Sequence, residues 1–289
     1  MPIRPRRSVL YMPGSNARAL EKARSLPADA LILDLEDAVA PDAKETARAQ
    51  VCEAVGARGF GRREVAIRIN ALTTVWGAAD LAAAAKAQPD AILIPKVSSP
   101  AELVLVEQHL TGTPGASIAL WAMMETPLAI LNAGAIAGAG GRLACLVMGT
   151  NDLIKEFRGR HTPDRQNLSA ALGLSVAAAR AYGLSIVDGV YNDIADAEGF
   201  LASCRQARAF GFDGKTLIHP SQLAPCNEVF APAREEVEAA RKIIAAFELP
   251  ENRDKGAIAL DGRMVERLHA EIAHDTVALA DAIAALEEP

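Results

Sequence analysis

The chain has 289 residues, of which 51% are hydrophobic and 23% are charged, and its formal net charge is −6. This composition is ordinary for a globular enzyme of one large or two small domains, and the lack of a long basic block argues against binding to nucleic acid or to a membrane surface. The four cysteines have no CxxC spacing, and the N-terminal apolar run is too short for a signal sequence, so we expect a cytoplasmic protein with reduced thiols.

Short apolar runs alternate along the chain with alanine-rich segments that carry charges at helical spacing. The runs predict strands at Val9–Met12, Ala30–Leu35, Val65–Ile69, Ala91–Pro95, Ser117–Met124, Leu143–Met148, Ser185–Val187 and Thr216–Ile218. The segments between them predict helices at Ala17–Ser25, Ala43–Ala57, Trp76–Ala87, Pro100–Leu110, Pro127–Ala135, Gln166–Tyr182 and Asp193–Phe210. About eight strand–helix units match an α/β fold of the (β/α)8 TIM barrel type. A doubly wound sheet is the alternative, but it usually has fewer strands, and the first turn lacks the GxGxxG spacing of a dinucleotide loop.

Most of the predicted strands end in polar residues. These residues are Asp34, Glu36 and Asp37 at the second strand, Arg68 and Asn70 at the third, Lys96 at the fourth, Glu125 at the fifth, Asp152 at the sixth, Asp188 at the seventh and His219 at the last. Polar groups at one end of most strands are typical of a barrel mouth, where the active sites of this fold lie. The pattern therefore indicates an enzyme.

Glu125 and Asp152 follow neighbouring strands, so their carboxylates are expected to face each other across the barrel mouth. Oxygen ligands without nearby cysteine or histidine suit Mg²⁺, which keeps several waters and takes one or two protein carboxylates. A bound Mg²⁺ would stabilise negative charge on substrate oxygens. The alternative is that both residues are N-caps of the helices that follow them. The spacing alone leaves both interpretations open.

The segment Leu33–Asp37 places three carboxylates at the end of one strand. Asp34 and Glu36 point the same way because a strand alternates its faces, and adjacent carboxylates are able to hold metal-bound waters. Asp37 either caps the next helix or pairs with Arg68. Arg68 lies in an otherwise apolar strand and requires an anionic partner, which is either a structural carboxylate or a substrate carboxylate bound by both arms of the guanidinium. We favour the substrate carboxylate.

Tyr11, Arg18 and Lys22 lie at the end of the first predicted strand and on one face of the helix after it. An arginine and a lysine on one face are able to bind a phosphorylated ligand, although a solvated helix face is the commoner role of such a pair. His219 lies beside a proline after the last strand, and we expect it to be structural. The chain has no GxSxG elbow and no evident Cys–His arrangement, so a hydrolase triad is not expected.

The alternating pattern ends near residue 230. Ala231–Glu248 predicts an amphipathic helix, Gly256–Met264 a small ordered turn, and Val265–Leu286 a second helix. A barrel does not need this tail, so we expect a catalytic barrel domain over 1–230 and a helical extension over 231–289. The extension is either a lid or an arm that packs on a neighbouring subunit.

Eight motifs stand in order along nearly the whole chain: RRSVLYMPGSN (6–16), LILDLEDAV (31–39), IRIN (67–70), ILIPKV (92–97), METP (124–127), MGTNDL (148–153), GFDGKTLIHPSQ (211–222) and GAIALDGRMV (256–265). Together they resemble the citrate lyase β-subunit-like CoA-ester lyases. These are relatives of the malyl-CoA and citramalyl-CoA lyases in the HpcH/HpaI aldolase superfamily.

The resemblance implies an architecture and a binding site for the thioester. It implies a (β/α)8 barrel whose C-terminal extension reaches a neighbouring subunit in a homo-oligomer, usually a trimer or a multiple of trimers. Tyr11, Arg18 and Lys22 fall where the family contacts its CoA thioester substrate.

The resemblance also implies the reaction, which is the reversible C–C cleavage of a 3-hydroxyacyl-CoA into an acyl-CoA and a 2-oxo acid. Mg²⁺ is implied on Glu125 and Asp152, and the carboxylate of the substrate on Arg68. A base takes the hydroxyl proton, the C–C bond breaks, and the enolate of the thioester requires stabilisation.

One position departs from the family pattern. Some relatives carry an aspartate that acts across the subunit interface, two residues after the methionine of the GxM block, where this chain has Glu266. A glutamate is still able to act as a general acid or base, although its extra methylene changes its reach. Either Glu266 takes the role, or the proton chemistry or thioesterase capacity of this protein differs from that of its relatives. The general base is unassigned, and the candidate catalytic residues are Arg68, Glu36, Asp37 and Glu266.

Our leading hypothesis is a stand-alone Mg²⁺-dependent CoA-ester lyase that acts on a thioester of the malyl-CoA or citramalyl-CoA type. One alternative is an aldolase that cleaves free 2-oxo-4-hydroxy acids without CoA, against which the cations of the first helix count. Another is the β subunit of a multi-subunit citrate lyase complex, which acts on a thioester of an acyl carrier. Binding of CoA thioesters, and activity with and without carrier subunits, distinguish the three.

Overall fold

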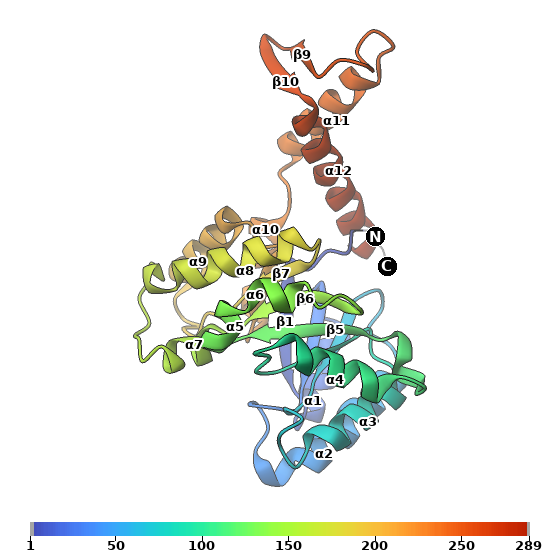
Figure 1. Cartoon of the computed structure of the whole chain (residues 1–289), viewed down its shortest axis with the longest axis vertical. Helices are drawn as coiled ribbons and strands as arrows, with labels where there is room; N and C mark the ends of the chain where they lie inside the picture. The colour runs from blue at the N-terminus through green and yellow to red at the C-terminus, as the bar shows by residue number, and fades with distance from the viewer. Residues whose placement is uncertain (1–2, 288–289) are drawn as a thin grey trace. The chain divides into compact units, whose positions relative to one another are not determined.

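The strands of the main unit form one closed parallel barrel. The structure is a computed structural model, and it describes residues 3–287. Around the barrel lie β1 (Ser8–Pro13), β2 (Ala30–Asp34), β3 (Glu64–Arg68), β4 (Ala91–Ile94), β5 (Ala119–Met124), β6 (Leu143–Met148), β7 (Ser185–Asp188) and β8 (Gly214–Leu217). Neighbouring strands are parallel, and β8 pairs back with β1. Figure 1 shows β1, β5, β6 and β7 of this barrel among the surrounding helices. The predicted (β/α)8 barrel is therefore confirmed, and the doubly wound sheet is excluded.

Helices connect the strands on the outside of the barrel. They are α1 (Ala17–Ala23), α2 (Lys44–Gly56), α3 (Gly77–Ala87), α4 (Pro100–Leu110), α5 (Pro127–Leu131), α6 (Ala133–Ala137), α7 (Thr150–Glu156), α8 (Ser169–Ala181), α9 (Ala197–Phe210) and α10 (Leu223–Phe230), with short 3₁₀ helices at Pro41–Ala43, Pro114–Ser117, Gln166–Leu168 and Pro220–Gln222. The helix predicted over Pro127–Ala135 is interrupted at Asn132, whose side chain donates a hydrogen bond to the carbonyl of Ser98. No bounds for α7 and α10 were predicted from the sequence.

The N-terminal end of the barrel is closed by Arg6. Its Nε lies 2.6 Å from Oε2 of Glu64, its Nη1 lies 2.6 Å from Oγ of Ser185, and its guanidinium stacks on Trp121 at 5.1 Å from the ring centroid. Trp121 is fully buried in the apolar filling of the barrel. These charged groups are paired with one another and stabilise the N-terminal end of the barrel. Active sites of this fold lie at the opposite end, where the strands end.

The C-terminal segment from residue 230 onward belongs to a second compact unit, separate from the barrel unit Arg6–Val229. It contains α11 (Arg234–Glu248), β9 (Ala257–Leu260), β10 (Arg263–Glu266) and α12 (Arg267–Glu287). The prediction of a small turn over Gly256–Met264 is wrong, because β9 and β10 form an antiparallel hairpin. Its turn residues Asp261 and Gly262 have positive φ. Only one residue in each of these strands is buried, whereas the barrel strand β4, which has the same length and was predicted, is buried throughout.

The hairpin packs on the two helices of this unit through Phe247, Ile258, Val265 and Ala270. Val265 pairs with Ile258 in the hairpin, so α12 begins at Arg267 and not at Val265 as predicted. The apolar core thus fixes where the strand ends and the last helix starts.

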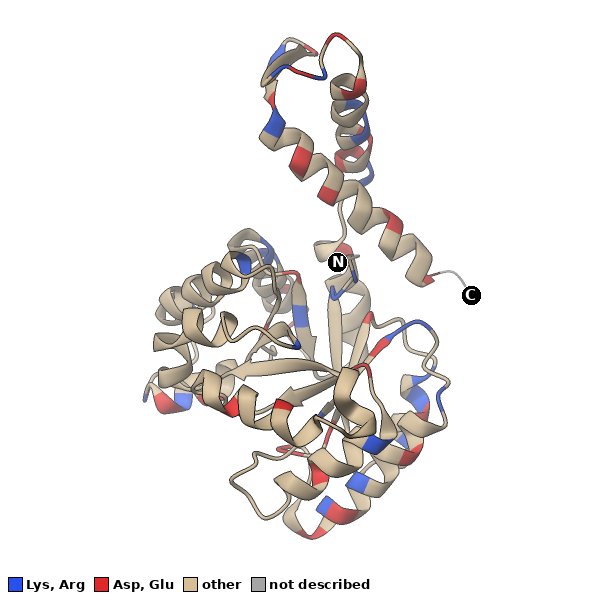
Figure 2. Cartoon of the chain, turned by 45° about the vertical axis from the view of Figure 1, so that its right-hand side comes forward, with Lys and Arg blue, Asp and Glu red and all other residues tan. Residues whose placement is uncertain are grey.

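Charged residues of both signs are interspersed along the outer helices (Figure 2). Charges distributed in this way form weak, salt-screened pairs rather than an extended field of one sign. Among residues 3–287, no helix combines the length and the apolar character that crossing a membrane requires.

Candidate active site

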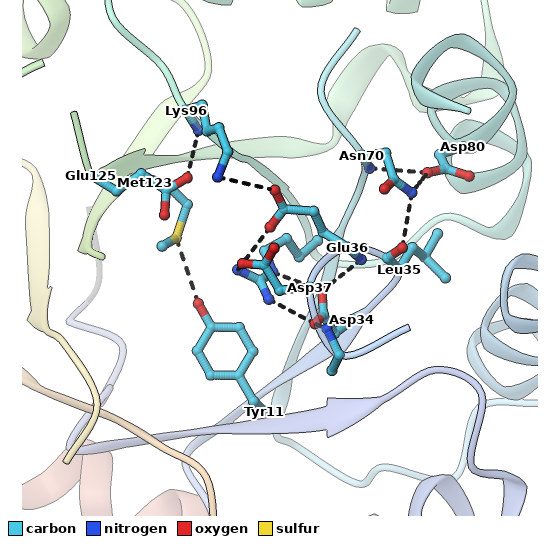
Figure 3. Close-up of polar contacts among 12 residues, drawn as sticks. Tyr11, Asp34, Leu35, Glu36, Asp37, Asn70, Asp80, Lys96, Met123 and Glu125 are labelled. Carbon is cyan, nitrogen blue, oxygen red and sulfur yellow. Dashed lines mark hydrogen bonds and ion pairs between the residues drawn. The ribbon is translucent and has the colours of Figure 1, made fainter. Parts of the chain in front are cut away.

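Polar residues from five neighbouring strand ends converge at the C-terminal mouth of the barrel. Glu36 follows β2, Arg68 ends β3, Lys96 follows β4, Glu125 follows β5, and Asp152 lies in α7 after β6. The backbone N–H of Lys96 donates to Oε1 of Glu125 at 2.7 Å (Figure 3). The ammonium of Lys96 lies 3.4 Å from Oδ2 of Asp152 and 3.6 Å from Oε1 of Glu36. Lys96 therefore links three carboxylates that are far apart in the sequence.

The helix N-caps beside Glu125 and Asp152 are other residues. Thr126 caps α5, since its Oγ1 accepts a hydrogen bond from the backbone N–H of Ala129 at 3.0 Å. Gly149 holds the N-cap position of α7, and Asp152 lies inside the first turn of that helix. The N-cap alternative for the two carboxylates is therefore wrong.

The carboxyl group of Glu125 has an electrostatic environment that favours a cation. Its residue is only 1% exposed. Burial, followed by the repulsion of Glu36, raises the pKa of Glu125 to about 7, against the attraction of Lys96. Burial likewise raises the pKa of Glu36, although the attraction of Arg68 opposes this shift. A positive charge placed between these groups would relieve both the repulsion and the loss of solvation.

The space beside Glu125 depends on Gly149. A Cβ atom at this glycine would collide with the side chain of Glu125 and would lie 3.0 Å from Cε of Met123. The backbone N–H of Gly149 donates to the carbonyl of Met124 at 3.1 Å, which ties the start of α7 to the end of β5. The absence of a side chain therefore lets the turn before Asp152 approach Glu125 closely.

The donor set fits a magnesium ion better than a transition metal. Within residues 3–287, no cluster of three or more His, Cys, Asp or Glu side chains is arranged to hold a metal ion. Glu125 and Asp152 offer oxygen atoms only, and Mg²⁺ usually binds through one or two carboxylates while it keeps several waters. The residues present are compatible with that mode of binding.

Arg68 is held by carboxylates of its own chain. Its Nε and Nη2 each lie 2.7 Å from an oxygen of Asp34, and its Nη1 lies 3.0 Å from Glu36 and 3.5 Å from Asp37. Burial opposes ionisation of Asp34, but the attraction of Arg68 holds the pKa of this carboxyl below its ordinary value. From the sequence, we favour a substrate carboxylate as the partner of Arg68. In the structure, its partners are the carboxylates of Asp34, Glu36 and Asp37. A substrate contact for Arg68 stays a prediction.

Two of the other candidates lie beside this arginine. The ring of Tyr11 lies 4.8 Å from the Arg68 guanidinium, and its hydroxyl is 3.5 Å from Sδ of Met123. Asp37 pairs with Arg68 and does not cap a helix, since Ala40 and Ala43 hold the N-cap positions that follow it. Glu36 and Asp37 both reach the arginine because β2 ends at residue 34 and no longer alternates its faces.

The remaining candidates are not joined to this cluster. Arg18 and Lys22 lie on the exposed face of α1. Glu266 lies in the second unit, where its side chain is exposed and its backbone N–H donates to Nδ1 of His269. His219 caps the 3₁₀ helix at 220–222 through Nδ1, so its expected structural role is confirmed.

Lys44 holds the loop after β2, a role that the sequence did not reveal. Its ammonium donates to the carbonyls of Leu35 at 2.9 Å and Glu36 at 2.8 Å, and to Oδ1 of Asn70 at 2.8 Å. Lys44 is buried on α2, and two of its partners are main-chain atoms, which carry no sequence signal. The sequence did identify Lys96, as a polar residue at the end of a predicted strand.

The chain is similar to known proteins over most of its length. A model of the HpcH/HpaI aldolase/citrate lyase family matches residues 7–220. A (3S)-malyl-CoA thioesterase of Cereibacter sphaeroides (strain KD131) is 53% identical over 281 residues, which cover 97% of this chain and 96% of the relative. The citrate lyase subunit beta of Escherichia coli (strain K12) is 35% identical over 269 residues, which cover 91% and 89%.

Solved structures resemble the chain as well. CitE from Mycobacterium tuberculosis, in complex with magnesium, acetoacetate and coenzyme A, is 30% identical with a TM-score of 0.77, and the match covers 96% of this chain and 98% of that one. A citrate lyase from Burkholderia xenovorans LB400 has a TM-score of 0.83 at 19% identity and covers 98% and 92%, so it supports the fold alone. Magnesium in the first of these structures agrees with the cofactor predicted from the sequence.

Proposed function

Because the chain belongs to the HpcH/HpaI aldolase/citrate lyase family, we propose that it is a Mg²⁺-dependent CoA-ester lyase. Its reaction would be the reversible C–C cleavage of a 3-hydroxyacyl-CoA, of the malyl-CoA or citramalyl-CoA type, into an acyl-CoA and a 2-oxo acid. The observation that carries the proposal is the meeting of three carboxylates at Lys96, directly beside Arg68: the ammonium of Lys96 pairs with Glu36 and Asp152, and its backbone N–H donates to Glu125.

The side chains at the mouth have distinct roles in this proposal. Glu125 and Asp152 hold Mg²⁺, which when bound would polarise the oxygens of the 2-oxo acid part of the substrate. Arg68 orients the adjacent carboxylate, since its position is fixed by Asp34. Glu36 is a candidate for proton transfer because its carboxyl lies beside Arg68 and burial raises its pKa above the ordinary value.

The thioester and the oligomer require residues outside the cluster. We infer that Tyr11, Arg18 and Lys22 contact the CoA part of the substrate, which the exposed cations of α1 support. We also infer a cytoplasmic homo-oligomer, a trimer or a multiple of trimers, in which the extension 231–289 packs on a neighbouring subunit. The free cysteines support a reducing compartment. In this assembly Glu266 would act as a general acid or base in the site of the neighbour.

A thioesterase is a second candidate function, because the relative that is 53% identical is a (3S)-malyl-CoA thioesterase. Such an enzyme hydrolyses the thioester bond, so it releases free CoA from malyl-CoA without the formation of a 2-oxo acid. The two activities thus differ in their products.

The test is a panel of malyl-CoA, citramalyl-CoA and 3-hydroxy-3-methylglutaryl-CoA with Mg²⁺. Separate assays measure the 2-oxo acid that cleavage of the first two would release, the acetoacetate (a 3-oxo acid) that cleavage of the third would release, and free thiol. We expect release of a 2-oxo acid from one of the thioesters. The variants Glu125→Gln and Asp152→Asn should lower this activity by about 100-fold or more and weaken Mg²⁺ binding, because each removes an anionic oxygen ligand.

Other results would contradict the lyase proposal. Free thiol without 2-oxo acid would favour the thioesterase, and cleavage of free 2-oxo-4-hydroxy acids would favour a CoA-independent aldolase. Activity only in the presence of carrier and transferase subunits would favour a citrate lyase β subunit. Full activity in either variant would reject the metal assignment.

A further inference from the structure

Lys96 has an unusual backbone conformation. It follows β4 and has a φ of 55°, in the left-handed region that glycine and asparagine adopt more easily than a lysine. This conformation directs its backbone N–H to Oε1 of Glu125 at 2.7 Å (Figure 3). Residues with such sparsely populated backbone conformations cluster at functional sites, and Lys96 lies next to the predicted active site.

The ammonium of Lys96 contacts Asp152, one of the two carboxylates proposed to hold the metal ion. It lies 3.4 Å from Oδ2 of Asp152 and 3.6 Å from Oε1 of Glu36. Both distances exceed those of a well-formed charged hydrogen bond, and the side chain is 45% exposed. Arg68 differs, because it is buried and its two bonds to Asp34 are 2.7 Å long. The Arg68 cation is therefore fixed in the fold, whereas the Lys96 cation is weakly held and able to move away.

We propose that the ammonium of Lys96 is the resident counter-ion of the carboxylate cluster and competes with the divalent cation for Asp152. The proposal rests on the metal site proposed above. A divalent cation on Asp152 would repel an ammonium a few ångströms away, so binding of the metal favours a position of the ammonium farther from this carboxylate. In the metal-free protein the same ammonium offsets the repulsion among Glu36, Glu125 and Asp152.

The test measures binding of Mn²⁺ or Mg²⁺ to the full-length protein by titration calorimetry, without substrate. Lys96→Met should bind the metal about three- to tenfold more tightly than the wild type, because the competing charge is gone. Its melting temperature without metal should fall, and its gain on saturation with metal should exceed that of the wild type. Lys96→Arg, which keeps the charge, should not show the tighter binding.

A matched control excludes a general effect of removing a lysine, and a second variant at Lys96 excludes an effect of poor folding. Lys86→Met makes the same exchange at an exposed position on α3 and should leave metal affinity unchanged. Lys96→Asn removes the same charge and suits the left-handed conformation, so it serves if Lys96→Met folds poorly.

Two failures are distinguishable. Unchanged or weaker metal binding by Lys96→Met, or equally tight binding by Lys86→Met, would overturn the role of Lys96 while the metal site stands. Binding at the wild-type level by Glu125→Gln and Asp152→Asn would overturn the metal site itself, and the role of Lys96 with it.

Discussion

The chemistry of single residues at the barrel mouth is set by their partners. Arg68 shows this most clearly, since Asp34 takes two of its nitrogens and Glu36 lies 3.0 Å from the third. A guanidinium held from two sides presents its charge at a fixed place, which a flexible side chain does not. Asp34, which is fully buried, has its own role in this arrangement because it positions the arginine.

The exchange Arg68→Lys should lower kcat/KM for the thioester by about 100-fold, because a lysine cannot form the two parallel bonds to Asp34. It should also lower the free energy of unfolding by about 1–3 kcal/mol, since a buried acceptor loses a bond. Kinetics and chemical denaturation measure the two effects. Arg180→Lys, at the partly exposed pair with Asp213, is the control and should retain activity. Wild-type kcat/KM in Arg68→Lys would contradict the assignment.

At the scale of elements, a buried ion cluster joins β7 and β8 to the loop before α8. Lys215 is fully buried, and its ammonium lies 2.6 Å from Oδ2 of Asp188. Arg165 adds a second cation at 2.7 Å from the same oxygen. Burial opposes ionisation of Asp188, but the attraction of Lys215 and Arg165 holds its pKa below the ordinary value of 3.8. This carboxylate therefore stabilises the closure of the barrel.

Asp188→Asn should lower the free energy of unfolding by about 3–5 kcal/mol at pH 7, because it leaves Lys215 buried without an anion. A lowered pKa in the folded state means that the stabilisation is full above about pH 4 and is lost as the pH falls through the folded pKa. The difference between variant and wild type should therefore be constant from pH 7 to about pH 4 and shrink below it. Urea denaturation at a series of pH values measures this.

Glu238→Gln is the control for that experiment. It removes one partner of an exposed pair with Arg234 on α11 and should change stability by less than about 1 kcal/mol. A difference for Asp188→Asn that grew as the pH fell below 4 would contradict the assigned sign of the pKa shift.

At the scale of the whole molecule, the candidate residues are divided between two compact units. The carboxylate cluster belongs to the barrel unit, whereas Glu266 lies exposed at the end of β10 in the other. If the second unit packs on a neighbouring subunit, a complete site would combine Glu125 of one subunit with Glu266 of the next. Oligomers that mix two inactive variants can therefore contain complete sites.

Glu266→Gln and Glu125→Gln should each be nearly inactive alone, but oligomers that contain both should regain activity. With random assembly, about a quarter of the sites would carry both intact residues. Co-expression with two affinity tags, followed by the lyase assay, measures the recovery. Hybrids without activity, or a fully active Glu266→Gln, would contradict action of Glu266 across subunits.

The sequence by itself determined the barrel and the ring of polar residues at its mouth. Alternation of apolar runs with helical segments is a local property, and parallel strands place their ends at one edge, so the order of residues along the chain suffices to locate strand ends such as Glu125 and Lys96. The strands of the hairpin were missed, because only one residue in each is buried, whereas a barrel strand of the same length such as β4 is buried throughout and forms an apolar run.

Only the tertiary structure decided which groups meet. Arg68 pairs with Asp34, Lys44 donates to the side chain of Asn70, and Lys96 pairs with Asp152. Each of these contacts joins residues far apart in the chain. Such pairings depend on the register of neighbouring strands and on the direction of each side chain. Burial, which raises the pKa of Glu125 to about 7, is likewise a property of the packed barrel and not of the residue.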